Sequence, residues 1–256
     1  MTRVSASVLL CALLPALSAC GRDLPTTPTG PTGPTSIMQV FPGTIAPGEN
    51  TMFEFTLPAT QELRMTLASL TDAAGLPLGT PVTFSFGVVS ATDNTVCDPL
   101  TSITNATARL TSHIAVIAAG GAYCVGLTDT SGLPVTAHLS IRLIYGVPSD
   151  AEQSGTISYT STVVPTGSTS RTFAAAENGT ASITMESFQT PGVTALGLAV
   201  GIQRNDGTGC EVAATLVASA GQVLNVPVDA GRYCVKVYDP GTLMTPATFT
   251  IRIQHP

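Results

Sequence analysis

Residues 121–125 and 231–235 carry the same motif, Gly-x-Tyr-Cys-Val, and lie 110 residues apart. The alternating segment 139–143 (LSIRL) returns at the same offset as 249–253 (FTIRI). Further matches lie upstream at larger offsets, namely Cys97 with Cys210 at 113, Phe86-Gly87 with Val200-Gly201 at 114, and Phe55 with Phe173 at 118. Each change of offset falls in a Gly/Pro-rich loop, as duplication followed by loop trimming would produce. A period this long indicates two domains rather than a solenoid.

Both copies consist of short stretches of alternating residues separated by Gly, Pro, Asn and Ser. No stretch sustains a helical period of 3.6 residues, so we predict an all-β fold of tandem duplicated β-sandwich or jelly-roll domains. Asn178-Gly179, between two such stretches, predicts a type I′ hairpin turn, in which both central residues need positive φ. The strands are expected at 37–45, 51–57, 63–70, 81–89, 101–108, 112–117, 121–129 and 135–145, and then at 156–164, 170–175, 180–188, 195–203, 212–217, 221–227, 231–239 and 247–253.

The boundary between the repeats is predicted in Gly146–Ser154, where the alternation stops and polar turn residues gather. The first β-sandwich repeat then spans 37–146 and the second 154–256. We expect each to fold independently, and the alternative is one two-sheet domain with a shared core.

The first twenty residues have the layout of a secretory signal peptide. Arg3 supplies the positive charge, and residues 8–17 form an apolar stretch of about ten residues, whereas a membrane-spanning helix needs roughly 20. The sequence Leu17-Ser18-Ala19-Cys20 resembles the lipobox of bacterial lipoproteins. That resemblance implies removal of residues 1–19, lipidation of the Cys20 thiol and acylation of its new amine. An ordinary secretory peptide with an incidental cysteine is the alternative.

Gly21 follows the lipobox, in place of the aspartate that often retains bacterial lipoproteins at the inner membrane. The resemblance therefore implies a protein of the cell envelope, anchored in the outer membrane on its periplasmic or surface face. Residues 20–36 are expected to form the lipidated cysteine and a flexible tether, because the Pro/Thr/Gly run from Leu24 to Ser36 has no apolar face to bury.

With Cys11 in the signal and Cys20 lipidated, four cysteines remain. An even number in an exported chain implies disulfides, and four cysteines allow three pairings. The repeat selects the pairs within each copy, Cys97–Cys124 and Cys210–Cys234. Strand phase places Cys234 on the face opposite the core, so we expect its bridge to staple a loop or neighbouring strand outside the main core.

The motif Gly-x-Tyr-Cys-Val, followed by a turn and an alternating strand, resembles the end of the bacterial pre-peptidase C-terminal domain. The resemblance covers residues 112–145 and 222–253. It implies a jelly-roll-like β-sandwich that acts as an accessory module in binding or structure. The chain departs from that family in having the disulfide and in lacking an attached catalytic domain.

Composition bears on the class of partner. Charged residues make up 10 % of the chain, the net charge is −6, and Lys236 is the single lysine. Nucleic acid needs clustered basic residues, so we expect no nucleic-acid partner. The absence of tryptophan argues against an aromatic carbohydrate platform.

No residue set has the spacing of a catalytic or metal site, so we predict no enzyme, no cofactor and no metal. Asp129 and Asp239 occupy equivalent turns and are expected to hold them, with calcium binding as the alternative. Tyr123 and Tyr233 are expected to pack in the core with bonded hydroxyls rather than stack on sugars. By strand phase, one basic patch is predicted on the outer face of the second copy as a candidate anionic-ligand site, formed by Arg232, Lys236, Tyr238 and Arg252.

The sequence thus favours a non-enzymatic, lipid-anchored envelope protein whose tandem sandwiches serve interaction or structure. Its expected partners are the membrane, through the lipid, and an envelope protein or polysaccharide. An envelope polysaccharide-binding protein is the first alternative, and an uncharacterised hydrolase is the second.

Overall fold

The computed structural model describes residues 37–93, 95–145, 154–204 and 209–256. The expected signal peptide, the lipidation site Cys20, the tether and the domain boundary at 146–153 lie outside the described residues. In the described part of the chain, no helix is long and apolar enough to cross a membrane.

The described residues form sixteen β-strands and no helix, which confirms the all-β prediction. Predicted and observed strand ends differ most at the start of β5, which begins at residue 97 rather than 101. The first copy contains β1 (Ile37–Ile45), β2 (Asn50–Leu57), β3 (Gln61–Thr71), β4 (Val82–Val89), β5 (Cys97–Ala106), β6 (Ile114–Ala118), β7 (Gly121–Thr128) and β8 (Ala137–Tyr145). The second contains β9 (Gly155–Val163), β10 (Ser168–Ala175), β11 (Gly179–Phe188), β12 (Leu196–Gln203), β13 (Cys210–Ala218), β14 (Val223–Val228), β15 (Gly231–Tyr238) and β16 (Ala247–His255).

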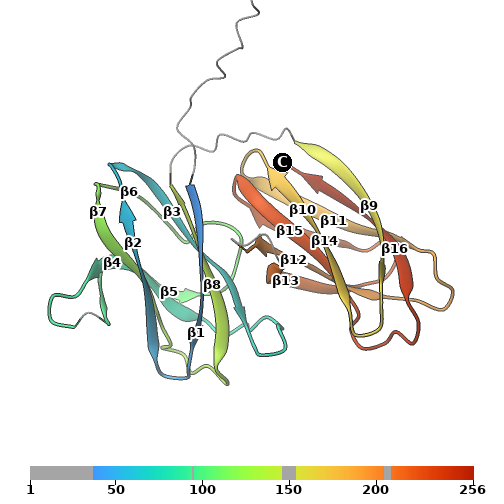
Figure 1. Ribbon diagram of the computed structural model, residues 1–256, viewed down its shortest axis with the longest axis horizontal. Coiled ribbons are helices and arrows are strands. Elements are labelled where there is room, and N and C mark those ends of the chain that lie inside the picture. Colours follow the sequence, from blue (N-terminus) through green and yellow to red (C-terminus); the bar gives the residue numbers. More distant parts are fainter. Residues whose placement is uncertain (1–36, 94, 146–153, 205–208) are drawn as a thin grey trace, which may run out of the picture. The chain divides into compact units, whose positions relative to one another are not determined.

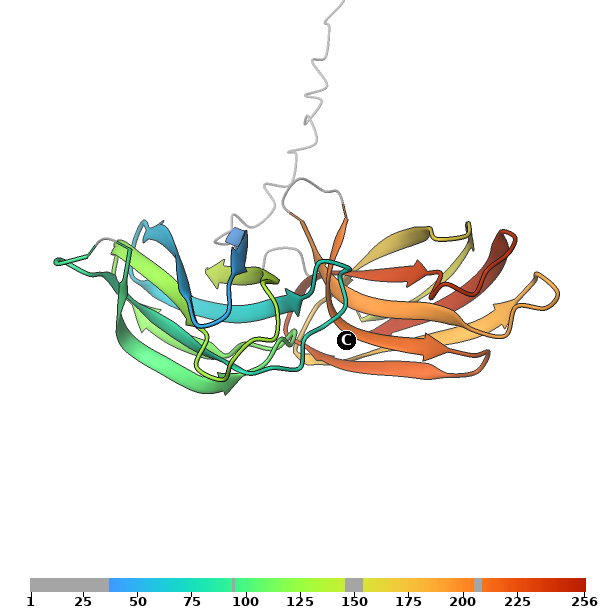
Figure 2. The same ribbon diagram turned by 90° about the horizontal axis from the view of Figure 1, so that it is seen from below.

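Both copies have the same topology. The first pairs its strands in the orders β1-β8-β3-β6 and β2-β7-β4-β5, and the second in the orders β9-β16-β11-β14 and β10-β15-β12-β13. Every pairing is antiparallel, and the order is that of an eight-stranded jelly roll. The first sandwich runs from blue to green in Figures 1 and 2, and the second from yellow to red. The internal repeat is therefore a duplication of a complete sandwich.

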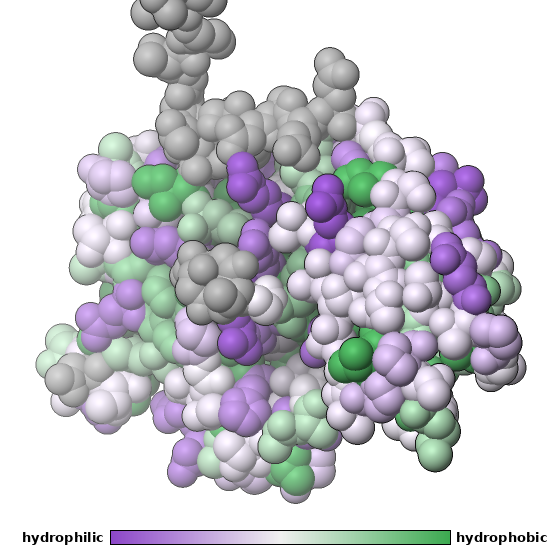
Figure 3. Space-filling model, turned by 45° about the vertical axis from the view of Figure 1, so that its right-hand side comes forward, coloured by the Kyte–Doolittle hydropathy of each residue, from purple (hydrophilic) through white to green (hydrophobic). Residues whose placement is uncertain are grey.

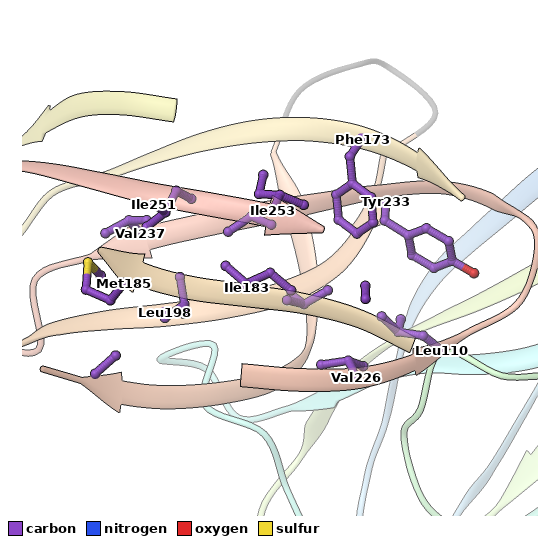
Figure 4. Close-up of a cluster of buried hydrophobic side chains, with 14 of the residues drawn as sticks. Leu110, Phe173, Ile183, Met185, Leu198, Val226, Tyr233, Val237, Ile251 and Ile253 are labelled. Atoms are coloured by element: carbon purple, nitrogen blue, oxygen red, sulfur yellow. The ribbon is translucent and has the colours of Figure 1, made fainter. Parts of the chain in front are cut away.

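The core of each sandwich lies between its two sheets. In the second sandwich, Tyr233, Val235 and Val237 of β15 are buried from one sheet, and Phe249, Ile251 and Ile253 of β16 are buried from the other. Figure 4 shows several of these side chains meeting between the strands. This confirms the core face that strand alternation predicts, since alternate residues of a strand point to the same side.

The predicted disulfides Cys97–Cys124 and Cys210–Cys234 are both present, each with Cα atoms 5.8 Å apart. Each bridge joins the two strands that flank a central strand, β4 or β12. Glycine allows the neighbouring strand to approach closely beside the bridge, because a Cβ on Gly87 would lie 1.9 Å from the Asp98 carbonyl oxygen of β5. Gly201 has the same role, 1.8 Å from the Glu211 oxygen. Cys234 alternates with the core residues Tyr233 and Val235, so its bridge lies on the outer face of the sheet, as predicted.

The predicted hairpin at Asn178-Gly179 is wrong. It joins β10 to β11, which belong to different sheets, and Gly179 is not among the residues with positive φ. The Asn178 side chain instead accepts a hydrogen bond from the Ala230 amide at 2.9 Å. The dipeptide thus crosses between sheets and ties down the loop before β15.

The two sandwiches meet through the outer face of the β1-β8-β3-β6 sheet. Val40, Ala68 and Leu110 of the first sandwich pack into the apolar cluster of the second, and Figure 4 shows Leu110 among those side chains. Arg142 of β8 is fully buried there, and its guanidinium carbon lies 5.0 Å from the centre of the Tyr233 ring. A desolvated cation–π contact of this kind contributes about 2 kcal/mol.

Hydrogen bonds complete this interface. Arg142 Nη2 donates to the Leu110 carbonyl at 2.6 Å. The Asp229 carboxylate accepts the Ser112 amide at 2.8 Å and also the Ser112 hydroxyl. The Tyr233 hydroxyl donates to the Asp229 carbonyl at 2.6 Å, and burial raises the pKa of Tyr233 above its usual 10. Of these bonds, the two between Ser112 and Asp229 cross from one sandwich to the other, and Arg142 Nε and Nη1 are buried without a hydrogen-bond partner among the described residues.

The corresponding face of the second sandwich is open. Arg252 is the repeat counterpart of Arg142, yet its side chain is 45 % exposed and lies 3.3 Å from Glu186. Around it β9 and β16 present threonines, with the hydroxyls of Thr160 and Thr250 2.9 Å apart. In Figure 3, where this side of Figure 1 comes forward, much of the surface is pale, the colour of intermediate hydropathy. The two copies have therefore diverged in what their equivalent sheets contact.

Candidate ligand groove

The structure divides the predicted basic patch. Lys236 and Tyr238 lie on the outer face of β15, and Arg232 lines a separate small hollow with Arg171. Arg252 belongs to β16 in the other sheet, so the expected common face is wrong for this residue. β15 and β16 belong to the two facing sheets of the sandwich, so the outward direction of β16 is opposite to that of β15.

Lys236 and Tyr238 border two adjoining hollows with shared lining residues, which we together name the β15 groove. Its larger part is a cavity of about 620 Å³ bounded by β1, β8, the β3–β4 loop, the start of β13 and β15. Its smaller part, of about 220 Å³, continues to the β9–β10 turn and is lined by Tyr238 and Asp239. Gly75, Val212 and Lys236 line both parts.

The carboxylates of the groove all have partners. Asp72 accepts the amides of Ala74 and Leu76, each at 2.9 Å. Glu211 is ion-paired with Arg204. Asp239 accepts the Thr166 amide at 2.9 Å and three further amides from its own turn. These bonds, that from Thr166 foremost, hold the pKa of Asp239 below its ordinary 3.8. The negative charges of the groove are thus engaged within the protein.

Two other polar side chains of the groove have no hydrogen-bond or ion-pair partner among the described residues. Lys236 is half-buried, and its ammonium group makes no ion pair or side-chain hydrogen bond with any other described residue. The Ser140 hydroxyl is fully buried and has no partner among the described residues. A buried polar group without a partner carries a free-energy cost. Lys236 is accessible to a ligand that enters the groove, whereas the Ser140 hydroxyl is enclosed in the groove wall.

Tyr238 lies flat against the sheet. A Cβ on Gly197 would lie 2.3 to 2.5 Å from three atoms of the Tyr238 ring. Three nearly equal distances mean that one face of the ring rests on the glycine, which leaves the other face for the groove that the residue lines. Partial burial raises the pKa of Tyr238, so the phenol stays neutral at ordinary pH. The position offers a flat ring beside a cation.

The turn aspartates have the predicted structural role. Asp129 accepts the Gly48 amide and the amides of Ser131, Gly132 and Leu133, and these bonds hold its pKa below its usual 3.8. Asp239 repeats the pattern in the second copy. Within the described residues, no cluster of three or more His, Cys, Asp or Glu could hold a metal ion.

The tyrosines of the repeated motif pack as predicted. Tyr233 is fully buried with a bonded hydroxyl. Tyr123 is half-buried, lies 5.1 Å from the Phe86 ring, and donates to the Ala119 carbonyl at 3.1 Å. Tyr238, which lies outside the motif, is the ring that reaches the groove.

His113 is a buried structural residue. Its Nδ1 accepts the Leu67 amide at 3.2 Å, and its Nε2 lies 2.9 Å from the Thr107 carbonyl, which fixes a neutral ring protonated at Nε2. The pKa of His113 is lowered from 6.5 to about 4, chiefly by burial and also by the charge of Arg109, while the hydrogen bond with Thr107 opposes the shift.

The groove also contains Ser140, His138 and Asp72, residue types that could form a hydrolytic triad. No hydrogen bond among the described residues links any two of them, and Asp72 accepts amides of its own turn. Sequence reasoning did not select this set, since its members come from β8 and the β3–β4 loop and share no motif.

No known protein family matches the chain, and no curated protein matches it. Among solved structures, a protein of Sulfolobus turreted icosahedral virus is 14 % identical and covers 87 % of this chain and 93 % of its own, with a TM-score of 0.24. The CUB1-EGF-CUB2 domains of rat MASP-1 are 10 % identical, with coverages of 83 % and 97 % and a TM-score of 0.24. A fucolectin from striped bass (Morone saxatilis) serum is 10 % identical, with coverages of 84 % and 85 % and a TM-score of 0.26. Similarity at this level carries no argument about function.

Proposed function

We propose that this chain is a non-enzymatic, lipid-anchored protein of the cell envelope, whose two jelly rolls act together as an interaction or structural module. The observation that carries the proposal is the buried contact of Arg142 with Tyr233 and of Ser112 with Asp229. It uses residues of both sandwiches, so the two copies share a buried contact. One disulfide in each sandwich supports an oxidising compartment outside the cytoplasm.

The anchor is tested directly at Cys20. Metabolic labelling with a fatty-acid analogue should tag the full-length protein and leave the Cys20→Ser variant unlabelled. Fractionation should then recover the labelled protein with the outer membrane. Equal labelling of both proteins would remove the lipid anchor from the proposal.

Polysaccharide binding is the second candidate function, and the flat Tyr238 ring beside the partnerless Lys236 favours it. A glycan array with the purified full-length protein tests it, and pull-down from envelope extracts tests the protein partner. Incubation with broad panels of protease, esterase and glycosidase substrates tests for enzymatic activity. Turnover that a single Ser140 or His138 substitution abolishes, with folding intact, would replace the proposal by a hydrolase.

A further inference from the structure

We propose that the β15 groove binds an acidic oligosaccharide, a chain of hexuronate residues, with its carboxylate at Lys236 and a sugar ring on Tyr238. The proposal rests on the second candidate function and specifies its ligand class.

Charge decides the sign of the ligand. The protein as a whole is acidic, yet within the groove the described carboxylates are engaged by Arg204 or by backbone amides. Lys236 alone of the groove's described charges has no partner. A half-buried ammonium gains most from an anion that replaces its lost hydration, and hydrogen bonds between charged groups are about twice as strong as neutral ones. The groove therefore selects a negative group at this point.

The exposed face of the Tyr238 ring favours a ligand that contains a ring able to stack on it. This face lies on the same side of β15 as Lys236, two residues away, and successive outward residues of a strand are about 6.7 Å apart. A pyranose ring stacked on the phenol would therefore bring a carboxylate on it or on the next sugar within reach of the lysine. Phosphate or sulfate would satisfy Lys236 but would leave the ring unused.

Ser140 supplies an independent observation. The residue lines the same groove, and its hydroxyl is enclosed in the groove wall with no partner among the described residues, so a ligand would reach it only if the wall opened. The exposed His138 lies two residues before it on the same face of β8. Sugar hydroxyls both donate and accept, which is the complement that an unsatisfied serine requires. The length of the groove, which extends from β8 to the β9–β10 turn, suits several linked sugars rather than one.

The test uses calorimetry on the full-length protein with tetragalacturonate and with its fully methyl-esterified form. The two probes share every atom of the sugar backbone and differ in charge. Tetragalacturonate should bind more tightly than the ester by about tenfold or more, and its affinity should fall with added salt. Lys236→Gln should remove the preference, while Tyr238→Ala should weaken both probes.

Arg252→Gln is the matched control, because it also removes one positive charge from the second sandwich but in the opposite sheet. It should leave both affinities unchanged, and thermal melting should show that each variant is folded. An equal affinity of the wild type and Lys236→Gln for tetragalacturonate would overturn the proposal. So would an equal loss in Arg252→Gln. If the ester binds as well as the acid, polysaccharide binding stands and the charge assignment falls. If neither binds, both fall.

Discussion

Lowering the pH should destabilise the first sandwich through His113. The ring is neutral in the fold because Nδ1 already accepts the Leu67 amide and burial disfavours the charged form, so its pKa falls from 6.5 to about 4. Above pH 6.5 the ring is neutral in the folded and unfolded chains, and its contribution to stability is complete. Below pH 6.5 the unfolded chain takes up a proton that the folded chain refuses, so stability is lost as the pH falls towards 4.

The size of the effect follows from the pKa difference. At roughly 1.4 kcal/mol per pH unit, a fall from 6.5 to about 4 corresponds to at most about 3–4 kcal/mol. Most of this should be lost by pH 4.5. Urea unfolding followed by far-ultraviolet circular dichroism at pH 7.0 and 4.5 measures it directly. The ordinary pKa values of Asp and Glu lie below this range, so His113 dominates the interval.

His113→Asn is the informative variant. Its amide can accept the Leu67 hydrogen bond and donate to Thr107 but cannot titrate, so the variant should be less stable at pH 7.0 and nearly independent of pH down to 4.5. His138→Asn, at an exposed histidine, should keep the wild-type slope. The reasoning fails if His113→Asn retains the full pH dependence of the wild type.

Three further results are expected. Gly87→Ala should destabilise the first sandwich by about 1–3 kcal/mol because its Cβ collides with the Asp98 oxygen. Gly79→Ala, which has open space around it, should leave the stability unchanged. Similar melting temperatures for the two variants would contradict the steric role of Gly87. Asp229→Ala should lower the free energy of unfolding by about 1–3 kcal/mol, because the Ser112 amide and hydroxyl lose their acceptor. An unchanged free energy on urea unfolding would show that water replaces the carboxylate. Residues 154–256 expressed alone should fold, with lower stability than in the full chain. An unfolded circular dichroism spectrum would mean that the second sandwich folds only together with the first.

Strand positions were predictable because the signal is local. Alternation identified all sixteen strands, and the duplicated register selected the disulfide pairs without knowledge of the sheets. The start of β5 was missed since residues 98–100 pair with or follow the edge of β4 but are exposed, so alternation carries no core signal there. The hairpin prediction at Asn178-Gly179 failed for a related reason: turn propensity does not reveal which sheet the next strand joins.

The candidate site was only partly predictable. Lys236 and Tyr238 were found from strand phase, since both lie on one strand. Ser140 could not be found, because its burial depends on the second sandwich packing against β8. Arg142 and Arg252 make the limit plain: they occupy the same place in the repeat, but one is fully buried beside Tyr233 and the other is exposed. Local sequence cannot distinguish two copies whose surroundings differ.

The single lysine has a practical consequence for biochemical work on this protein. Acylation of the Cys20 amine, which the lipobox resemblance implies, would leave Lys236 as the only primary amine in the mature chain. An amine-reactive dye or biotin reagent would then modify one position, inside the β15 groove. Occupancy of the groove could be followed as protection of that amine from labelling. By the same chemistry, immobilising the protein by amine coupling would fasten it by the groove and mask the surface under study.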